Sequence, residues 1–434
     1  MSSSLLLVLV VVFSFAIGHL VTRRAARFVT LSGVEYALVG LLIGPHFVWR
    51  LMSAPALASF QPLISLLLGL LGFVLGLRVR HAMTQPANAG AGMLSTLGVI
   101  AAMTALLLPL VGYLSPAQQS SGFEFTRSLL HLRGYVLELH FTSNHLWVAL
   151  ALASAAGVVS APLVGHIRAL HRASGRVTDI VEVAASVSQV VAVLVYGLML
   201  SSTRASSGKA PIPMTVVEWA VASIGTAIVS GLLFSLFIGR ENDSSRVFLA
   251  TIGLVTFASG VGAALGISPL FINLLAGVTV AATSAHADRV QEHLERLQHP
   301  LFVLIMIFAG AHFVPVRGWG WLLPAVYVVA RYLLRRLLTP LSLRMLVVDG
   351  PRVGRIGHGL LSQGTLAVAI ALDFALQNPR HHALVLGTVL IGAFVSDLWS
   401  DRALASLLAD AGETGKAEAS DVEVQQPKAA PEVS

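Results

Sequence analysis

Stretches of mostly apolar residues recur along the chain, separated by shorter polar or basic stretches. Their length, about 17 to 25 residues, is the length at which an α-helix crosses the hydrocarbon core of a membrane. Lipid offers no hydrogen-bond partner to the backbone, so such segments are expected to be helical. The pattern predicts thirteen membrane-spanning segments, at residues 4–20, 31–49, 57–77, 92–113, 144–167, 180–201, 214–238, 246–266, 268–284, 299–316, 319–340, 356–377 and 382–399.

The composition agrees with this pattern, because 56% of the 434 residues are hydrophobic and 11% are charged. It excludes a water-soluble globular protein and predicts an all-α polytopic membrane protein of about thirteen transmembrane helices. The chain has no cysteine, which excludes disulfides, thiol catalysis and cysteine-based metal sites. Large apolar side chains become rare after Trp399, so we expect residues 401–434 to form a disordered cytoplasmic tail.

Most arginines lie in the loops that follow odd-numbered segments; Arg23, Arg24 and Arg27, for example, follow the first segment. Short loops rich in arginine and lysine stay in the cytoplasm. We therefore expect a multi-pass protein of the cell (inner) membrane, with the N-terminus outside and the C-terminus in the cytoplasm. The net charge of +7 then reflects anchoring at the lipid bilayer and does not indicate nucleic-acid binding.

Short patterns in the first half recur seven segments later. Residues 38–42 (LVGLL) resemble residues 275–279 (LAGVT), and residues 72–79 resemble residues 307–314. An odd offset turns the second copy upside down, as in the inverted repeats of secondary transporters. Chance recurrence of small-residue packing patterns is the alternative. The repeat predicts one transmembrane domain at 1–400, divided into a first repeat at 1–201, a connector helix at 214–238 and an inverted second repeat at 246–399.

Segments five and twelve contain helix breakers and polar residues at membrane depth, in ASAAGVVSAPLVGH and GHGLLSQGTLAVAI. Where a membrane helix unwinds, its freed amides and carbonyls face protein or a wet cavity, which is also how they coordinate ions. We therefore expect two broken helices that cross. An ion-binding or substrate-binding site there would include Ser160, Pro162, Ser362, Gln363, Gly364 and Thr365. The alternative is a proline kink or a glycine packing notch.

With these elements in order, the chain resembles the monovalent cation:proton antiporter superfamily, of the sodium/hydrogen exchanger and potassium-efflux type. The resemblance covers nearly all of residues 5–399. It rests on YALVGLLIGPH at 36–46, GLLGFVLGLRVR at 69–80, LGISPLFINLLAGVTVA at 265–281 and SQGTLAVAIA at 362–371. Each motif alone is weak, and their order along the chain makes the resemblance specific.

The resemblance implies a homodimer with no cofactor and no enzymatic activity, which exchanges a monovalent cation (Na⁺ or K⁺) for protons. Segments one to three and eight to ten would form a dimerising panel. Segments four to six and eleven to thirteen would form a core that carries the ion and moves against the panel, an elevator-like form of alternating access. The family also keeps a basic residue in its eleventh helix, which corresponds to Arg331 here. Snorkelling of Arg331 to the inner face is the alternative.

One departure from the family concerns its acidic pair in the sixth helix. The register of SVSQVVAVLVYG places Ser188 and Gln189 at this pair. A midplane carboxylate titrates because desolvation raises its pKa towards working pH, whereas an amide or a serine hydroxyl does not titrate near neutral pH. Ser188 and Gln189 therefore offer neutral oxygens to a cation, or serve as polar contacts between helices. The resemblance predicts altered or lost proton coupling.

Other titratable residues are candidates for proton coupling. Glu182 lies on the same helical face as Gln189, seven residues earlier, which is roughly 10 Å closer to the cytoplasm. It would line an inner vestibule or remain an interfacial acid. His166 and His312 lie near helix breaks or ends and titrate near neutral pH. Asp373 and Asp397, towards the ends of their segments, are expected at the surface.

Three functional hypotheses follow. The leading one is a secondary active transporter with altered or lost proton coupling, and the second is a non-transporting membrane scaffold or sensor with an exchanger-like fold. An intramembrane enzyme comes last, because the sequence has neither a zinc motif nor a nucleophile elbow. If Arg331 faces the crossing without a carboxylate, the site would favour an anion.

Overall fold

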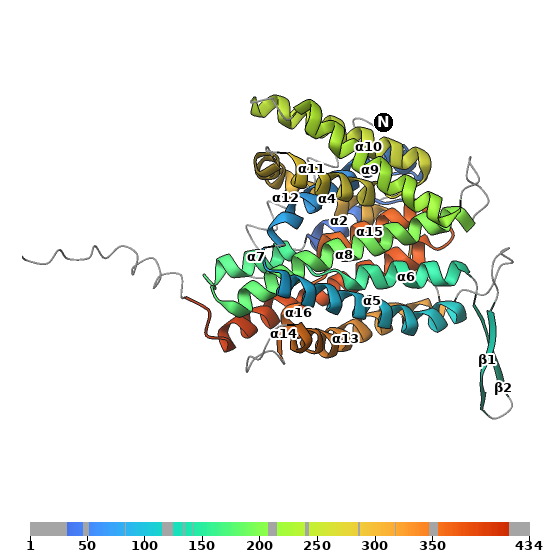
Figure 1. Ribbon diagram of the computed structural model, residues 1–434. Helices are drawn as coiled ribbons and strands as arrows, with labels where there is room; N and C mark the ends of the chain where they lie inside the picture. The colour runs from blue at the N-terminus through green and yellow to red at the C-terminus, as the bar shows by residue number, and fades with distance from the viewer. Residues whose placement is uncertain are drawn as a thin grey trace, which may run out of the picture.

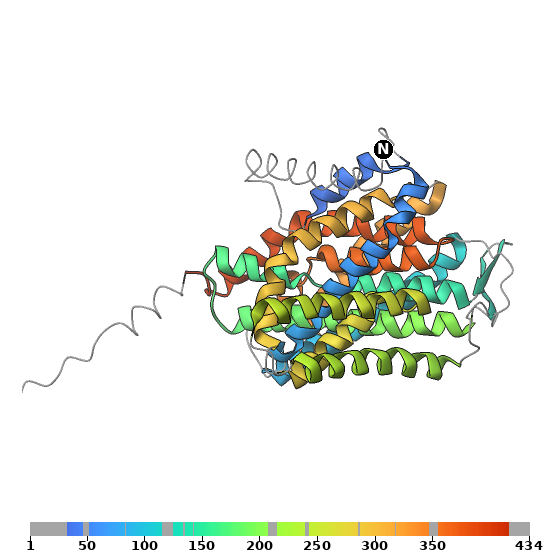
Figure 2. The ribbon, with the colours of Figure 1, turned by 90° about the horizontal axis from the view of Figure 1, so that it is seen from above.

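The computed structural model describes most of the chain as a bundle of helices. The described residues are 33–46, 52–82, 84–114, 125–132, 135–141, 143–206, 215–238, 243–284, 287–316, 318–346 and 355–415. The predicted first segment, at residues 4–20, lies outside them. Figures 1 and 2 show that most of the long helices run along one common direction.

The helices follow the predicted segments in order along the chain. They are α2 (Val34–Ile43), α3 (Ala54–Ser59), α4 (Gln61–Ala82), α5 (Pro86–Leu114), α6 (Ser143–Gly157), α7 (Ala161–Leu170), α8 (Arg176–Ser206), α9 (Val216–Ile238), α10 (Ser244–Leu265), α11 (Pro269–Thr283), α12 (Ala287–Ala311), the 3₁₀ helix η1 (Gly318–Trp321), α13 (Leu322–Leu346), α14 (Ile356–Gly359), α15 (Gly364–Gln377) and α16 (His382–Asp410). Within the described ranges, eight helical stretches are long and apolar enough to cross a membrane, and α11 and α15 are shorter apolar helices. The fold is an all-α polytopic membrane fold.

A pair of antiparallel strands is the one element type that the hydropathy pattern did not predict. Strands β1 (Phe125–Leu132) and β2 (Tyr135–Phe141) pair with each other between α5 and α6. They project from the right-hand end of the bundle in Figure 1. The hairpin belongs to a connection between helices and leaves the helical architecture unchanged.

The last helix is longer than its apolar segment, which corrects the predicted boundary of the tail. α16 continues to Asp410, eleven residues past the predicted end of its segment, because Leu404, Leu407 and Leu408 extend its buried face. Beyond it, the Glu413 carboxylate accepts hydrogen bonds from the Val177 amide at 2.9 Å and the Thr178 amide at 2.8 Å. Residues 401–415 therefore belong to the folded domain and cap the start of α8.

Two pairs of helices pack backbone to backbone. α2 lies along α12, and α4 lies along α11. At Gly72 of α4, an added Cβ would stand 2.1 Å from the Leu270 carbonyl oxygen, so only glycine permits this approach. The remaining helices form a second group in which α5 packs against α6, α8 and α13, and α15 packs against α6 and α16.

Both helix breaks that the sequence predicted are present. α6 ends at Gly157, and the chain resumes as α7 at Ala161. α14 ends at Gly359, and α15 begins at Gly364, whose φ of +68° lies in the left-handed region. At Gly364 an added Cβ would also stand 2.6 Å from Ser160 Oγ in the other break. Glycine is therefore required at this position by both backbone conformation and contact.

Gly364→Ala tests this fit between the two breaks. We expect a loss of about 1–3 kcal/mol from the left-handed backbone alone, and further loss from displacement of Ser160. The melting temperature of the purified protein in detergent should fall by several degrees. Gly225→Ala in α9 is the matched control, because its Cβ would meet no atom within 4 Å and its helix prefers alanine. Equal melting temperatures for the two variants would contradict this account.

Candidate functional site

The two broken helices cross in direct contact. In the first break, the Ser160 amide donates a hydrogen bond to the Ser362 carbonyl in the second, at 3.3 Å. Both serines are buried, with exposed fractions of 8% and 2%. The crossing therefore joins two segments that are about 200 residues apart in the sequence, as their numbers show. Its other carbonyls require donors, because the surrounding side chains are mostly apolar.

Arg331 of α13 supplies these donors to both breaks. Its Nε donates to the Ala156 carbonyl at 3.0 Å, and its Nη2 donates to the carbonyls of Val158 at 2.9 Å and Ser362 at 3.0 Å. Nη1 donates to the Leu361 carbonyl. The side chain is 1% exposed, so Arg331 faces the crossing and does not snorkel to the surface. Its planar guanidinium binds four carbonyls at once, which a lysine cannot match.

A second arginine and a carboxylate complete the charges at the crossing. Arg335, one turn further along α13, donates through Nη2 to the Gly157 carbonyl. Asp397 of α16 accepts a hydrogen bond from the Gln363 amide at 3.1 Å and interacts electrostatically with Arg331. It is 2% exposed, so the expectation of a surface position for Asp397 was wrong. Arg331 has a carboxylate nearby, which removes the premise for an anion site.

Ser188 is a structural partner of the first break. Its Oγ accepts a hydrogen bond from the Val159 amide at 3.0 Å and donates one to the Ala185 carbonyl at 2.7 Å. The side chain is fully buried. Because its hydroxyl is hydrogen-bonded to the unwound backbone, Ser188 contributes to the site by stabilising the conformation of the crossing.

Gln189, by contrast, faces a small cavity of about 20 Å³ beside the crossing, which is room for roughly one water molecule. Polar groups from both breaks line this cavity, and α4 and α12 form its opposite wall; the polar lining residues are Arg78, Ser160, Gln189, Gln298, Gln363 and Thr365. Pro162 also lines it, at the start of α7. No carboxylate is among the described residues that line this cavity. The structure thus brings Gln189 together with four of the break residues that the sequence singled out, Ser160, Pro162, Gln363 and Thr365, while Ser362 and Gly364 do not line the cavity.

Gln363 is held in one orientation. Its Nε2 donates to the Ala155 carbonyl at 3.1 Å and to the Tyr327 hydroxyl. Both bonds are made by the amide nitrogen. The amide oxygen, Oε1, is buried and has no hydrogen-bond partner among the described residues. The crossing therefore holds a neutral oxygen that accepts a cation or a hydrogen-bond donor.

A larger cavity, of about 440 Å³, adjoins the first and shares Arg78 and Pro162 with it. We call it the vestibule. Its charged and polar lining comes from α7 and α8 on one side and α4, α12 and the turn after α4 on the other; these residues are Arg78, Thr84, Gln85, Arg168, Asp179, Glu182, Ser186, Gln291 and Glu295. The vestibule lies at the end of the bundle where α8 begins, and it leads towards Gln189.

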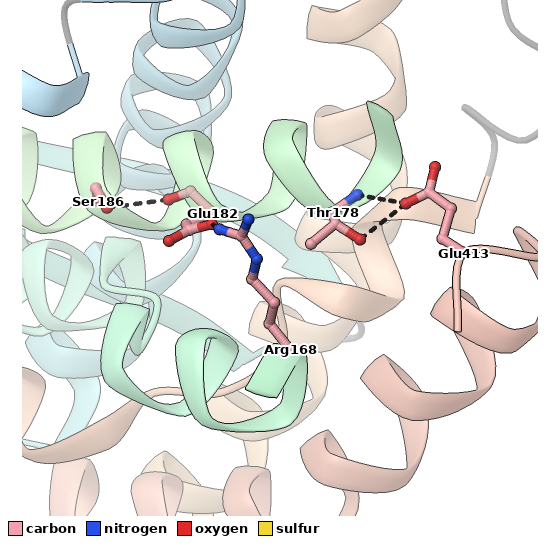
Figure 3. Close-up of polar contacts among 5 residues, drawn as sticks. All are labelled: Arg168, Thr178, Glu182, Ser186 and Glu413. Atoms are coloured by element: carbon pink, nitrogen blue, oxygen red, sulfur yellow. Dashed lines mark hydrogen bonds and ion pairs between the residues drawn. The ribbon is translucent and has the colours of Figure 1, made fainter. Parts of the chain in front are cut away.

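Glu182 lines the vestibule and forms an ion pair with Arg168 of α7. Figure 3 shows Glu182 and Ser186 on α8, with the Arg168 side chain reaching across from α7. The Ser186 hydroxyl donates to the Glu182 carbonyl at 3.0 Å. The side chain of Glu182 is 38% exposed, so the carboxylate is in contact with solvent. This position matches the vestibule alternative that its spacing from Gln189 predicted.

The two histidine candidates lie away from these cavities. His166 is exposed on α7, on a face close to Asp401 of α16. His312 follows α12, and its Nδ1 contacts the Phe308 carbonyl at 2.8 Å. Neither lines the cavity at Gln189 or the vestibule. The structure therefore does not bring His166 or His312 together with the other candidates.

Sequence reasoning missed Arg335, Tyr327 and Asp397 as parts of the crossing. Arg335 and Asp397 carried a usable signal, because an ionisable residue inside a membrane segment is rare and usually functional. Asp397 was assigned to the end of its segment, where charges are common, and Arg335 was not singled out. Tyr327 had no such signal, because a tyrosine in an apolar helix is equally expected at a lipid interface.

With this geometry in view, comparison with known proteins identifies the family. Residues 10–399 match the model of the sodium/hydrogen exchanger transmembrane family. The chain belongs to this family. No curated protein sequence matches the chain.

Solved structures of similar fold include a sodium proton antiporter, MjNhaP1 from Methanocaldococcus jannaschii. The structure of MjNhaP1 at pH 8 has a TM-score of 0.64 and 15% identity, with 94% of this chain and 99% of that chain covered. A second MjNhaP1 structure, from electron microscopy, has a TM-score of 0.58 and 16% identity, with 96% and 98% covered. At this identity the likeness establishes the exchanger fold alone.

Substitution of Arg331 tests its role in this member of the exchanger family. Arg331→Met removes the guanidinium donor from the carbonyls of Ala156, Val158 and Leu361, while the Ser362 carbonyl keeps the Ser160 amide. Each unpaired group costs about 1–3 kcal/mol. We expect little folded protein, measured as the monodisperse yield after size-exclusion chromatography. Arg331→Lys should recover part of this yield. Arg344→Met, at an exposed position of the same helix, should behave like the native protein. A native yield for Arg331→Met would contradict the role of Arg331.

Proposed function

We propose that the protein is a secondary active transporter of a monovalent cation, Na⁺ or K⁺, whose coupling to protons is altered or lost. Membership of the exchanger family and the fold of MjNhaP1, which is a sodium proton antiporter, support the transport activity. One observation carries the change in coupling. Gln189 occupies the cavity at the crossing, and the lining of this cavity contains no carboxylate in the described part of the chain.

The chemistry of this cavity determines what it binds. Exchange of a cation for protons requires a group that holds either one, as a desolvated carboxylate does. Gln189, Ser160 and the free Oε1 of Gln363 offer neutral oxygens, which bind a partly dehydrated cation and release no proton. The proposed site comprises Ser188, Gln189, Ser160, Pro162, Ser362, Gln363, Gly364, Thr365 and Arg331. Within it, Gln189 and Gln363 contact the ion, while Ser188 and Arg331 hold the crossing.

An elevator-like movement of two groups of helices would carry the ion across the membrane. We propose a panel that contains α2, α4, α10, α11 and α12, and a core that contains α5 to α8 and α13 to α16. The packing of α2 on α12 and of α4 on α11 supports inverted repeats. In the predicted repeat, α2 (segment two) corresponds to α11 (segment nine), and α4 (segment three) corresponds to α12 (segment ten). Exchange of these partners converts the first contact into the second. The cavity and the vestibule both lie between panel and core residues.

Orientation and assembly complete the proposal. The positive-inside rule places the vestibule in the cytoplasm, at the end of the bundle that also carries Arg168 and Arg176. The protein would then take cations from the cytoplasmic side of the cell membrane in the conformation described here. As the family resemblance implies, we propose a homodimer formed through the panel.

Flux into proteoliposomes tests the transport proposal. We expect uptake of ²²Na⁺ or ⁸⁶Rb⁺ when a membrane potential drives it, and none above protein-free liposomes when a pH gradient alone drives it. Gln189→Asp adds a carboxylate to the lining of the cavity, so its uptake should respond to the pH gradient. Gln291→Asp adds the same charge in the vestibule and is the control. If neither the membrane potential nor the pH gradient drove uptake, the transport proposal would be wrong. Uptake by the native protein under a pH gradient alone would contradict the proposed loss of coupling.

A second prediction concerns Glu182. Glu182→Gln removes a negative charge from the vestibule and leaves Arg168 without its ion pair, so cations should be attracted less strongly. We expect the apparent affinity for the cation to fall about twofold to fivefold at low ionic strength, with a smaller change in high salt. Glu292→Gln, on the exposed face of α12, is the control. A change in proton coupling without a change in affinity would instead make Glu182 the titrating group of the transport cycle.

A further inference from the structure

A second polar cluster lies between the proposed panel and core. Asp373 of α15 is 2% exposed, so the expectation of a surface position for this residue was wrong. Its carboxylate accepts a hydrogen bond from the hydroxyl of Ser268 at 2.5 Å. Ser268 is fully buried and caps α11, where its Oγ also accepts from the Phe271 amide at 3.2 Å. The bond between Ser268 and Asp373 therefore joins the start of a panel helix to a core helix.

Two further side chains converge on the same carboxylate. Gln377, one turn along α15, donates to Asp373 Oδ1 at 3.1 Å. Tyr196 of α8 is fully buried and interacts electrostatically with Asp373. Its hydroxyl is directed at this carboxylate but is not within hydrogen-bond distance and geometry of any described group, and Gln377 Oε1 has no hydrogen-bond partner among the described residues. The cluster therefore has unused hydrogen-bonding capacity around a buried acid, which is unusual in a protein interior.

The cluster lies beyond the cavity and in line with it. Glu182, Gln189 and Tyr196 follow one another on α8 at seven-residue intervals, so they share one helical face at steps of roughly 10 Å. On α15, Asp373 lies seven residues beyond Leu366, which lines the cavity. The face that runs from the vestibule through Gln189 thus continues to Tyr196 and Asp373. The buried cluster lies on the continuation of this face and lines neither cavity.

We propose that Asp373 is a proton-binding latch, which holds the far end of the path closed through Ser268 when ionised and releases it when protonated. The proposal rests on the panel and core of the proposed function. An ionised carboxylate accepts a charge-assisted hydrogen bond, which is about twice as strong as a neutral one. A proton taken up at Asp373 replaces this bond with a neutral one. The carboxylic acid then donates a hydrogen bond to the Tyr196 oxygen, and the core separates from Ser268.

Other titratable groups lie near this end of the bundle. They are His145 at the start of α6, His312 after α12, and His381 and His382 at the start of α16. Within the described residues, Ser268, Gln377 and Tyr196 are the groups that act directly on Asp373. A pH effect that comes from the latch must therefore disappear in Asp373→Asn, whereas one that comes from the histidines must persist.

The absence of cysteine from the native chain permits a direct test. Ile267→Cys places a single thiol next to Ser268, at a position that is fully buried in this conformation. Its rate of labelling by a water-soluble maleimide measures the population in which the far end is open. Asp373→Asn and Ser268→Ala should each raise this rate about tenfold, since each removes one charge-assisted hydrogen bond. Thr388→Ala, which removes a buried hydroxyl outside the cluster, should leave it unchanged.

Two further readouts separate the latch from other causes. Maleimide reacts with the thiolate, so each rate is divided by that of a vestibule thiol, Ser186→Cys, at the same pH. In the otherwise native Ile267→Cys protein this ratio should rise as the pH falls, and in Asp373→Asn it should be high and independent of pH. Every variant should elute as a monodisperse peak in size-exclusion chromatography, as the native protein does, which shows that it is folded. Unchanged labelling of Ile267→Cys in both latch variants would overturn the proposal, as would the same pH dependence with and without Asp373. The labelling needs no ion flux, so failure of the transport proposal would be seen separately.

Discussion

The backbone at the crossing needs hydrogen-bond partners at a depth where lipid provides none, and this requirement governs the rest of the structure. Two helices are interrupted there, and Arg331 binds carbonyls of both breaks. Ser188 binds the Val159 amide, and Asp397 binds the Gln363 amide. Each of these partners comes from a different helix. Loss of one partner would therefore disturb the packing of α8, α13 and α16 around the breaks, and not only a single hydrogen bond.

This arrangement explains how an exchanger fold persists without the family's acidic pair. The guanidinium groups of Arg331 and Arg335 donate hydrogen bonds to carbonyls, and Asp397 balances part of their positive charge. The crossing therefore needs no further carboxylate to be stable. The cavity is left with neutral oxygens at Gln189 and Gln363. Two acidic groups lie to either side of it along the bundle, with Glu182 in the vestibule and Asp373 in the buried cluster with Ser268. Under the proposals above, charge selection and proton binding would act at these two positions and not at Gln189.

The sequence predicted the helices and both breaks because these depend on local properties. Apolar length defines a spanning helix, and the breaks were marked by glycine or proline together with polar residues at membrane depth; proline alone was no such mark, because Pro109, Pro300 and Pro340 lie within continuous helices. The positions of Asp373 and Asp397 depend instead on which face of a helix is buried, and hydropathy alone does not distinguish a buried face from an exposed one near a helix end. The role of Ser188 was equally hidden, because its partner lies 29 residues away in an unwound segment. Residues 401–415 were assigned to the tail because charged neighbours lower the mean hydropathy around Leu404, Leu407 and Leu408.

The distance between Arg331 and the two breaks tests the account most directly. Solid-state NMR of protein in lipid, with ¹⁵N in the arginine guanidinium groups and ¹³C in the carbonyls of valine or serine, measures dipolar couplings between them. The account predicts couplings for Val158 and for Ser362 that correspond to about 4 Å, given the 2.9 Å and 3.0 Å hydrogen bonds and the length of a carbonyl bond. Loss of the serine coupling in Ser362→Ala would assign it. Absence of both couplings would mean that the crossing is held in another way, and the account would be wrong.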